Sequence, residues 1–264
     1  MNYFFNLALI LFVYMNLWFV VSLIKKRNDV ADIAWGLGFI LIVWASFLFS
    51  KDSGPRGLLV GVLVSIWGFR LAWHIFSRNK GKTEDYRYLV WRKKWGRLFY
   101  LRSYLQIYIL QGILLFFIAV PIMIINKKNG LSLGVLDFIG VFIWIIGFYF
   151  EAVGDAQLRR FVKNPRNKGK IMQSGLWAYT RHPNYFGEVT LWWGIFIISL
   201  GSSPFFYTIV SPLTITILIL FVSGIPMLEK KYEGNPEFEE YKKRTSVFFP
   251  LPTKKYEKDN RSQR

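Results

Sequence analysis

The densest group of polar side chains in this sequence lies in the segment Gly175–Glu188, directly before a long apolar run. Hydroxyl, guanidinium, imidazole, amide and carboxyl groups occur close together in it: Tyr179, Arg181, His182, Asn184, Tyr185 and Glu188. Pro183 favours a helix start there, and the spacing puts Asn184 and Glu188 on one helical face. Such a mixture at the mouth of an apolar helix predicts a polar binding site; a purely structural corner is the alternative.

A second candidate is a stripe of acids and a base. Glu151, Asp155 and Arg159 recur at every fourth position, which places them on one face of a helix. Ionisable groups inside apolar helices are costly unless they pair or face water, so they are functional candidates. The stripe predicts either a self-satisfied ladder that locks helices together or the polar wall of a ligand cavity. The loop that follows ends at Lys170 and carries cations suited to phosphate groups.

Further polar residues lie in or beside other apolar runs. Arg70 and His74 are one helical turn apart, with Trp67 one turn before them. The alternative role for Arg70 is to neutralise an acid on another helix. Asp29 and Asp32 precede an apolar run, where acids also act as ordinary helix caps.

Several kinds of chemistry are excluded. The chain has no cysteine, so disulfides, thiolate nucleophiles and cysteine-based zinc sites are absent. Its two histidines, His74 and His182, are far apart and no HExxH pattern accompanies them, so we expect no metal site. Neither GxGxxG nor GxxxxGK[ST] occurs, so a bound nucleotide would not be held by a Rossmann or P-loop turn.

Long runs without charge decide the fold class. Tyr3–Ile24, Ser103–Asn126 and Val189–Leu228 contain no charged residue over 22, 24 and 40 positions. About 20 apolar residues of helix cross a bilayer core of about 30 Å, so the longest run must turn, at Gly201–Pro204. The sequence predicts an all-α integral membrane protein, a bundle of seven transmembrane helices. We expect the spans at residues 3–24, 32–50, 57–77, 103–126, 135–158, 185–202 and 206–227.

The basic residues predict an orientation. Of 34 lysines and arginines, 29 lie in segments that would share one side of the membrane and four in segments on the other. The positive-inside rule then puts the N-terminus outside and the C-terminus in the cytoplasm. The net charge of +18 thus reflects topology and anionic membrane lipids, and we expect neither nucleic acid nor an obligate protein partner. We predict one membrane domain, 1–252, and a basic, frayed tail, 253–264. The Lys-, Ile-, Phe- and Asn-rich composition indicates an AT-rich bacterial genome, and we expect the protein in the bacterial cytoplasmic membrane.

Several segments match one known family. The matching stretches are Asp32-Ile-Ala-Trp35-Gly36, Gly154-Asp155-Ala-Gln-Leu-Arg159, Asn164-Pro165, Lys168-Gly169-Lys170, Arg181-His-Pro-Asn-Tyr-Phe-Gly-Glu188, Leu228-Glu229-Lys230-Lys231 and Tyr241-Lys-Lys-Arg-Thr-Ser-Val-Phe-Phe-Pro250. On these residues the chain resembles the membrane steroid 5α-reductases (3-oxo-5α-steroid 4-dehydrogenases), specifically their bacterial branch, described as the DUF1295 domain of unknown function. The resemblance extends from Asp29 to Pro252 and is strongest from residue 137 onward.

The resemblance implies a seven-helix membrane enzyme that takes NADPH from the cytoplasmic side and reduces an enone carbon–carbon double bond in a steroid-like or other lipid substrate. It also implies the residues that contact the cofactor: Asn79 and Lys82 in a turn, Glu151, Asp155 and Arg159 on the fifth span, Lys170, and Tyr179, Arg181, His182, Asn184 and Glu188 around the start of the sixth.

This chain departs from the family at the substrate end. The animal enzymes hold the substrate carbonyl with a glutamate and a tyrosine, whose nearest counterparts here are Asp32 and Trp67. A tryptophan can donate one hydrogen bond but cannot deliver a proton as a phenol can. Lys82 replaces an arginine, which weakens a bidentate contact, and Glu151 replaces an amide.

Reduction of an enone leaves negative charge on the carbonyl oxygen, so the site must donate hydrogen bonds there. We expect Asp32 to be this donor, kept protonated by burial beside lipid with no cation nearby. Trp67 or Tyr185 would be a second donor, and water would supply the proton to the α-carbon.

Two other functional classes remain open at this point. An Arg-His-Pro-x-Tyr turn also occurs in membrane methyltransferases that use S-adenosylmethionine and act on prenylcysteine or phospholipids. A non-enzymatic membrane protein, such as a transporter or an assembly factor, is the third class. The Asp155/Arg159 stripe, the segment Asp32–Gly36 and the tail Arg244–Pro250 favour the reductase.

Overall fold

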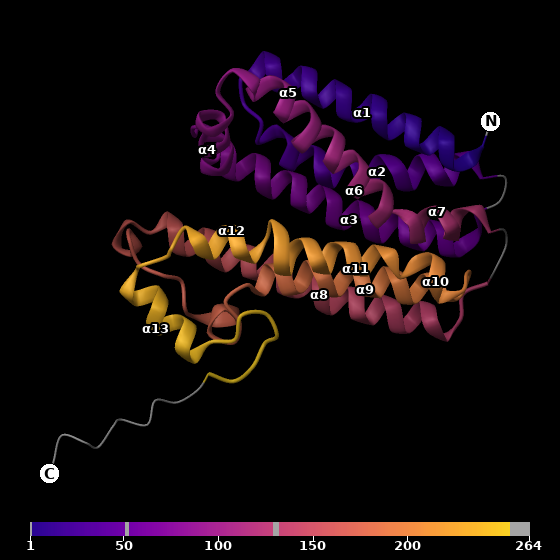
Figure 1. Cartoon of the computed structure of the whole chain (residues 1–264). Coiled ribbons are helices and arrows are strands. Elements are labelled where there is room, and N and C mark those ends of the chain that lie inside the picture. The colour runs from indigo at the N-terminus through magenta and orange to yellow at the C-terminus, as the bar shows by residue number, and fades with distance from the viewer. Residues whose placement is uncertain (1, 51–52, 129–131, 254–264) are drawn as a thin grey trace, which may run out of the picture. The chain divides into compact units, whose positions relative to one another are not determined.

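The structure is a computed structural model that describes residues 2–50, 53–128 and 132–253. All regular elements within these ranges are helices, and an isolated bridge pairs Thr180 with Ser246. The predicted all-α class is therefore confirmed (Figure 1). The predicted basic tail lies, from residue 254 onward, outside the described residues.

Six helical segments of the described chain are long and apolar enough to cross a membrane. They are Tyr3–Lys25, Val30–Phe49, Gly54–Asn79, Tyr86–Ile118, Val135–Lys163 and Phe205–Lys230. The predicted span 185–202 forms helix α9, Pro183–Leu200, but is not among the six. Asn184 and Glu188 lie in its first two turns. The structure thus supports a membrane protein with six candidate spans.

The chain divides into two compact units, Met1–Gly140 with Ile195–Thr214, and Val141–Gly194 with Ile215–Arg264. Helix α8, Val135–Lys163, begins in the first unit and continues in the second. The elements of the first unit, in chain order, are α1 (Tyr3–Lys25), α2 (Val30–Phe49), α3 (Gly54–Asn79), α4 (Tyr86–Trp95), η1 (Gly96–Leu98), α5 (Phe99–Ser103), the π-helix η2 (Tyr104–Ile109), α6 (Leu110–Ile118), α7 (Val120–Lys127) and, later in the chain, α10 (Phe205–Thr208).

Helices α2 and α3 approach each other closely at two glycines. A Cβ atom added at Gly36 would lie 2.7 Å from the carbonyl oxygen of Gly68, and one added at Gly68 would lie 2.6 Å from that of Gly36. Small residues at a helix crossing allow such contact in membrane bundles, where there is no hydrophobic drive between helices. This crossing brings the start of α2, with Asp29 and Asp32, beside the end of α3, with Asn79.

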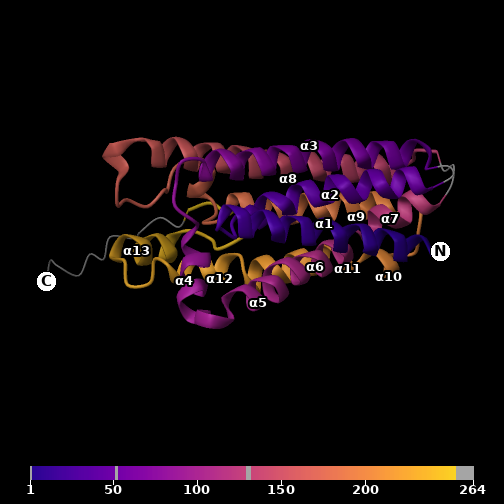
Figure 2. The same cartoon turned by 90° about the horizontal axis from the view of Figure 1, so that it is seen from above.

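The chain at and before the predicted fourth span, 103–126, is not one straight helix. Before the span, α4 ends at Gly96, which has a φ of +49°, and α4 runs across the direction of α1, α2 and α3 rather than along it (Figure 2). A second break follows Ala119, because Pro121 at the start of α7 lacks the N–H needed to continue α6.

A buried arginine joins three helix ends in the first unit. Arg56, expected among the few cations of the outer segments, is only 5% exposed. Its guanidinium donates twice to Asp137, at 2.7 and 2.8 Å, and also to backbone or hydroxyl oxygens of Ser132, Gly201 and Ser202 at 2.9 to 3.0 Å. All five guanidinium N–H groups have acceptors, so this is a structural site rather than a ligand site.

The second unit contains most of α8, the start of α9, and the C-terminal elements. These include the short 3₁₀-helices η3 (Pro165–Asn167) and η4 (Gly175–Ala178), the end of α11 (Val210–Ile217), the π-helix η5 (Leu218–Val222), α12 (Ile225–Lys230) and α13 (Pro236–Arg244). A Cβ atom at Gly187 would lie 2.4 Å from the carbonyl oxygen of Gly147 and 2.4 Å from the backbone nitrogen of Glu151. Helices α8 and α9 therefore cross in backbone contact just beside the predicted acid stripe.

Candidate functional site

The α8–α9 crossing brings two predicted residues together. The Asn184 amide donates to Oδ1 of Asp155 at 3.1 Å, and Asp155 is buried. Gly154 allows this contact, because a Cβ atom there would approach the backbone of Asn184 to 3.2 Å. Of the other residues on these faces, Glu151 is buried, Glu188 is half-buried and Arg159 is exposed. An amide and up to three carboxyl groups thus line this end of the α8–α9 pair.

The segment before α9 is held by the C-terminal chain. The backbone N–H of Arg181 donates to the Ser246 carbonyl at 2.8 Å, and the Thr180 hydroxyl donates to the Phe248 carbonyl at 2.8 Å. The phenol of Tyr241, on α13, donates to the carbonyl of Trp177, and burial raises the pKa of Tyr241. The C-terminal segment and the turn that precedes α9, which both resemble the same family, therefore bind each other.

Arg181 is committed to partners within the protein. Its Nε donates to Oε1 of Glu229 at 2.8 Å, and its Nη1 donates to the Thr245 carbonyl at 2.7 Å. The residue is 9% exposed. This arginine therefore joins the turn before α9 to α12 and to the end of α13.

His182 has one nitrogen paired and the other not. Nε2 lies 2.9 Å from Oε1 of Glu229, and the imidazole stacks on Tyr185 with ring centroids 5.6 Å apart. Nδ1 is buried and has no hydrogen-bond partner among the described residues. Burial lowers the pKa of His182 below its usual 6.5, against the opposing effect of Glu229. Buried polar atoms are nearly always paired, so the unpaired nitrogen of this imidazole is a candidate ligand contact.

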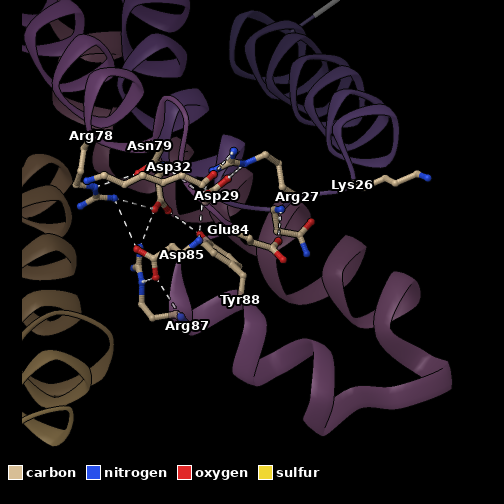
Figure 3. Close-up of polar contacts among 12 residues, drawn as sticks. Lys26, Arg27, Asp29, Asp32, Arg78, Asn79, Glu84, Asp85, Arg87 and Tyr88 are labelled. Carbon is tan, nitrogen blue, oxygen red and sulfur yellow. Dashed lines mark hydrogen bonds and ion pairs between the residues drawn. The ribbon is translucent and has the colours of Figure 1, made fainter.

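A charged cluster occupies the ends of α2, α3 and α4 in the first unit (Figure 3). Asp29 is 1% exposed and accepts two hydrogen bonds of 2.6 Å from the Arg27 guanidinium. It also accepts from the Asn79 amide at 3.3 Å and from the backbone N–H of Asp85 at 3.1 Å. Although Asp29 occupies the N-cap position of α2, its side chain makes no capping hydrogen bond. Asp29 therefore joins three elements instead of capping one.

The contacts of Asp32 contradict the prediction that it has no cation nearby. Its carboxylate accepts from the Arg87 guanidinium at 2.7 Å and from the Tyr88 phenol at 2.6 Å, and Arg78 lies at 3.9 Å. The expectation of an acid with no cation nearby is wrong, because α4 folds back and brings Arg87 onto it. With a guanidinium and a phenol both donating to it, Asp32 is an acceptor and not the hydrogen-bond donor that we expected.

The same arginines act on a neighbouring acid. Asp85 accepts from Arg87 at 3.0 Å, and Arg78 lies 3.7 Å away. Burial alone would raise the pKa of Asp85, but these hydrogen bonds and charges outweigh it and hold the pKa below its usual value. A further pair, Glu84 with Arg92 at 3.0 Å, ties α4 to the preceding loop. Acids and arginines in this cluster thus largely neutralise one another.

The predicted turn at residues 79–82 is present. Gly81 has a φ of +73°, and the N–H of Lys82 donates to the Asn79 carbonyl at 3.1 Å. The Lys82 carbonyl accepts from Arg27 at 3.2 Å, while the lysine side chain is exposed. In the second unit Lys170 and Tyr179 are also exposed. These side chains are accessible to a ligand, and their predicted role in cofactor binding stays a prediction.

The first unit also holds an apolar pocket of about 370 Å³. Residues of α1, η2 and α6 line it, including Met15, Phe12 and Tyr108. The Tyr108 phenol donates to the Asn28 amide oxygen at 3.3 Å, and the other lining residues are apolar. Trp67, predicted as a donor, is fully buried against Phe39.

Sequence reasoning missed several residues of these clusters. Arg87 and Tyr88 lie at the start of α4, and the signal was the pair of acids Glu84 and Asp85 followed closely by an arginine. Glu229 was noticed only within a matching stretch. The signal for its role was an acid at the end of a long apolar run, where an unpaired charge would be costly.

Comparison with known proteins gives two relatives and a family. An uncharacterised protein of Schizosaccharomyces pombe is 23% identical over 271 residues, which cover 92% of this chain and 78% of that protein. A probable O-methyltransferase, ustE, of Ustilaginoidea virens is 42% identical over 53 residues, covering 20% of this chain and 18% of that protein. No solved structure matches. The family described as "Protein of unknown function (DUF1295)" matches residues 18–245, and this chain therefore belongs to the DUF1295 family.

Proposed function

We propose that this protein is an NADPH-dependent oxidoreductase that reduces an enone carbon–carbon double bond in a steroid-like or other lipid substrate. The observation that carries the proposal is the group of buried polar atoms around the start of α9. Asp155 and Asn184 are paired there, and the buried Nδ1 of His182 lacks a partner among the described residues.

These residues fit a dinucleotide. Amide, carboxylate and imidazole groups can hydrogen-bond the carboxamide and hydroxyl groups of such a cofactor, and exposed cations such as Lys168 and Lys170 suit its phosphates. NADPH, when bound, supplies a hydride. The protein would bind and orient the cofactor, exclude water from the buried polar groups and hold the α8–α9 crossing rigid.

The first unit supports a lipid substrate. The apolar pocket lined by α1, η2 and α6 is suited to the hydrocarbon part of a lipid. Because Asp32 is a paired carboxylate, we assign to it the role of orienting the phenol of Tyr88. The roles of Trp67, Tyr185, Asn79 and Lys82 in the reaction stay predictions.

The topology is part of the proposal. We propose that α9 is the seventh span, since it is a continuous helix of 18 residues whose second half is apolar. With seven spans the uneven distribution of lysine and arginine puts the N-terminus outside and the C-terminus in the cytoplasm of a bacterial inner membrane.

A second function is favoured by one comparison. The local similarity to a probable O-methyltransferase supports S-adenosylmethionine as the alternative cofactor and methyl transfer as the alternative reaction. That similarity covers only a fifth of this chain. The same buried polar groups would then hold a different nucleoside.

Thermal unfolding of the purified full chain in detergent separates these functions. NADPH at one hundred times its dissociation constant should stabilise the protein by about 2.7 kcal/mol, and S-adenosylmethionine should not. Asp155→Ala should abolish the NADPH effect, whereas Glu239→Gln, which alters a more exposed carboxylate on α13, should keep it. The protein should then oxidise NADPH only when an enone lipid is added. Stabilisation by S-adenosylmethionine alone would favour the methyltransferase, and stabilisation by neither would reject both enzymes.

A further inference from the structure

The carboxylate of Glu229 determines which imidazole nitrogen of His182 carries a proton. A single oxygen, Oε1, lies 2.8 Å from Nε of Arg181 and 2.9 Å from Nε2 of His182. A guanidinium can only donate hydrogen bonds, so this oxygen is an acceptor. An acceptor oxygen at 2.9 Å from an imidazole nitrogen requires a proton on that nitrogen, because two lone pairs would otherwise face each other.

A neutral imidazole has one N–H group. If Nε2 carries it, Nδ1 presents a lone pair. A second proton is disfavoured, since the residue is 2% exposed and the Arg181 guanidinium shares its carboxylate. The lowered pKa of His182 agrees with this arrangement. Stacking on Tyr185 with an interplanar angle of 17° restrains the ring, so the lone pair has a defined direction.

We infer that Glu229 is a positioning residue that holds His182 in the Nε2–H tautomer, and that Nδ1 is an acceptor for an N–H or O–H group of the bound cofactor. The inference rests on the proposed function for the identity of that cofactor, but the tautomer does not depend on it. An acceptor lone pair repels phosphate oxygens, so His182 selects a neutral donor such as a carboxamide or a ribose hydroxyl and does not bind phosphate.

Nitrogen-15 NMR of the full chain with labelled imidazoles tests the tautomer directly. The sequence has only two histidines, so His74→Gln leaves His182 as the sole signal. At pH 7 Nε2 should show the shift of a protonated nitrogen and Nδ1 that of an unprotonated one. A proton on Nδ1, or on both nitrogens, would overturn the inference.

Variants at Glu229 test whether this residue positions the His182 imidazole. Glu229→Gln keeps an acceptor oxygen and should keep the tautomer, whereas Glu229→Leu removes it and should populate both tautomers. NADPH affinity should fall about ten-fold in Glu229→Leu and less than three-fold in Glu229→Gln. Glu233→Gln, at an exposed position three residues beyond α12, should match the parent protein. Equal affinity loss in both Glu229 variants with an unchanged tautomer would overturn a positioning role.

Added cofactor tests the donor. NADPH should shift the Nδ1 resonance of the parent protein to that of a hydrogen-bonded acceptor. An acetylpyridine analogue, which lacks the carboxamide N–H groups, should leave Nδ1 unshifted if the donor is the carboxamide and shift it if the donor is a hydroxyl. If NADPH fails to stabilise the protein, the proposed function fails while the tautomer result stands. If NADPH binds and Nδ1 does not move, the inferred contact is wrong.

Discussion

Asp32 accepts hydrogen bonds from a guanidinium and a phenol at once, and this decides its chemistry. Both of these donors carry N–H or O–H groups that point at the carboxyl oxygens, so Asp32 is an acceptor in both contacts. His182 shows the converse case, in which burial and a neighbouring arginine keep an imidazole neutral while Glu229 orients it. At this scale the function of a titratable group depends on two or three neighbours.

Replacement of Asp32 tests its pairing. Asp32→Asn keeps the shape of the side chain but removes the charge opposite Arg87, and it should lower the free energy of unfolding by about 1–3 kcal/mol. Tyr88→Phe removes one hydrogen bond to the same carboxylate and should cost about 1 kcal/mol. Denaturant unfolding in detergent measures both. If Asp32 were a neutral acid, the asparagine variant would be as stable as the parent.

The pH dependence of stability tests His182. Because its pKa in the folded protein is below 6.5, the unfolded chain takes up this proton first as the pH falls. Stability should therefore be fully present above pH 6.5 and decline below it. Thermal unfolding of His182→Gln should lose this part of the slope, and His74→Gln should retain it. An identical slope in the parent and in His182→Gln would show that His182 titrates normally.

At the scale of helices, glycines determine which polar groups meet. Backbone contact of α8 with α9 at Gly147 and Gly187 brings the Asn184 amide within 3.1 Å of Asp155. The contact of α2 with α3 at Gly36 and Gly68 has the same origin. Larger residues would separate these helices and the polar groups with them.

A methyl group at the α8–α9 crossing should therefore be destabilising. Gly187→Ala would put a Cβ atom 2.4 Å from the Gly147 carbonyl oxygen, and we expect a loss of about 1–3 kcal/mol from overpacking. Any cofactor-induced stabilisation should weaken with it. Gly134→Ala is the control, since no atom lies within 4 Å of a Cβ atom there. Denaturant unfolding that gave the two variants equal stability would refute a tight crossing.

At the scale of the whole chain, the distribution of lysine and arginine predicts the membrane topology, but individual cations differ in burial and pairing. In the proposed topology the lysines and arginines between Arg159 and Lys170 lie on the basic side, and they are mostly exposed. Arg56 lies on the opposite side in that topology and is instead buried on Asp137. If Arg56 is left out of the count as a structural residue, the two predicted sides differ in their number of lysines and arginines by more than the full count shows.

Labelling of introduced cysteines tests the orientation. The chain has no native cysteine, so single substitutions are unambiguous. In intact bacterial cells a membrane-impermeant maleimide should label Asn2→Cys and should not label Asn167→Cys. Opening the cells should make Asn167→Cys reactive. Labelling of both positions in intact cells would mean that the number of crossings separating them is even.

Local composition determined much of this protein. Charge-free runs of about 20 residues predict membrane helices because burial of apolar side chains in lipid needs no specific partner. Spacing by four residues likewise predicted that Asn184 and Glu188 share a face. The all-helical fold and most span positions follow from such local information.

Only the tertiary structure decided which charges meet. Arg87 reaches Asp32 across 55 positions of sequence, and His182 reaches Glu229 across 47. The burial of Arg56 likewise depends on contacts with residues up to 146 positions away. The physical reason is that a charged group takes its protonation and its role from neighbours within a few ångströms, and helix packing, not chain order, supplies those neighbours.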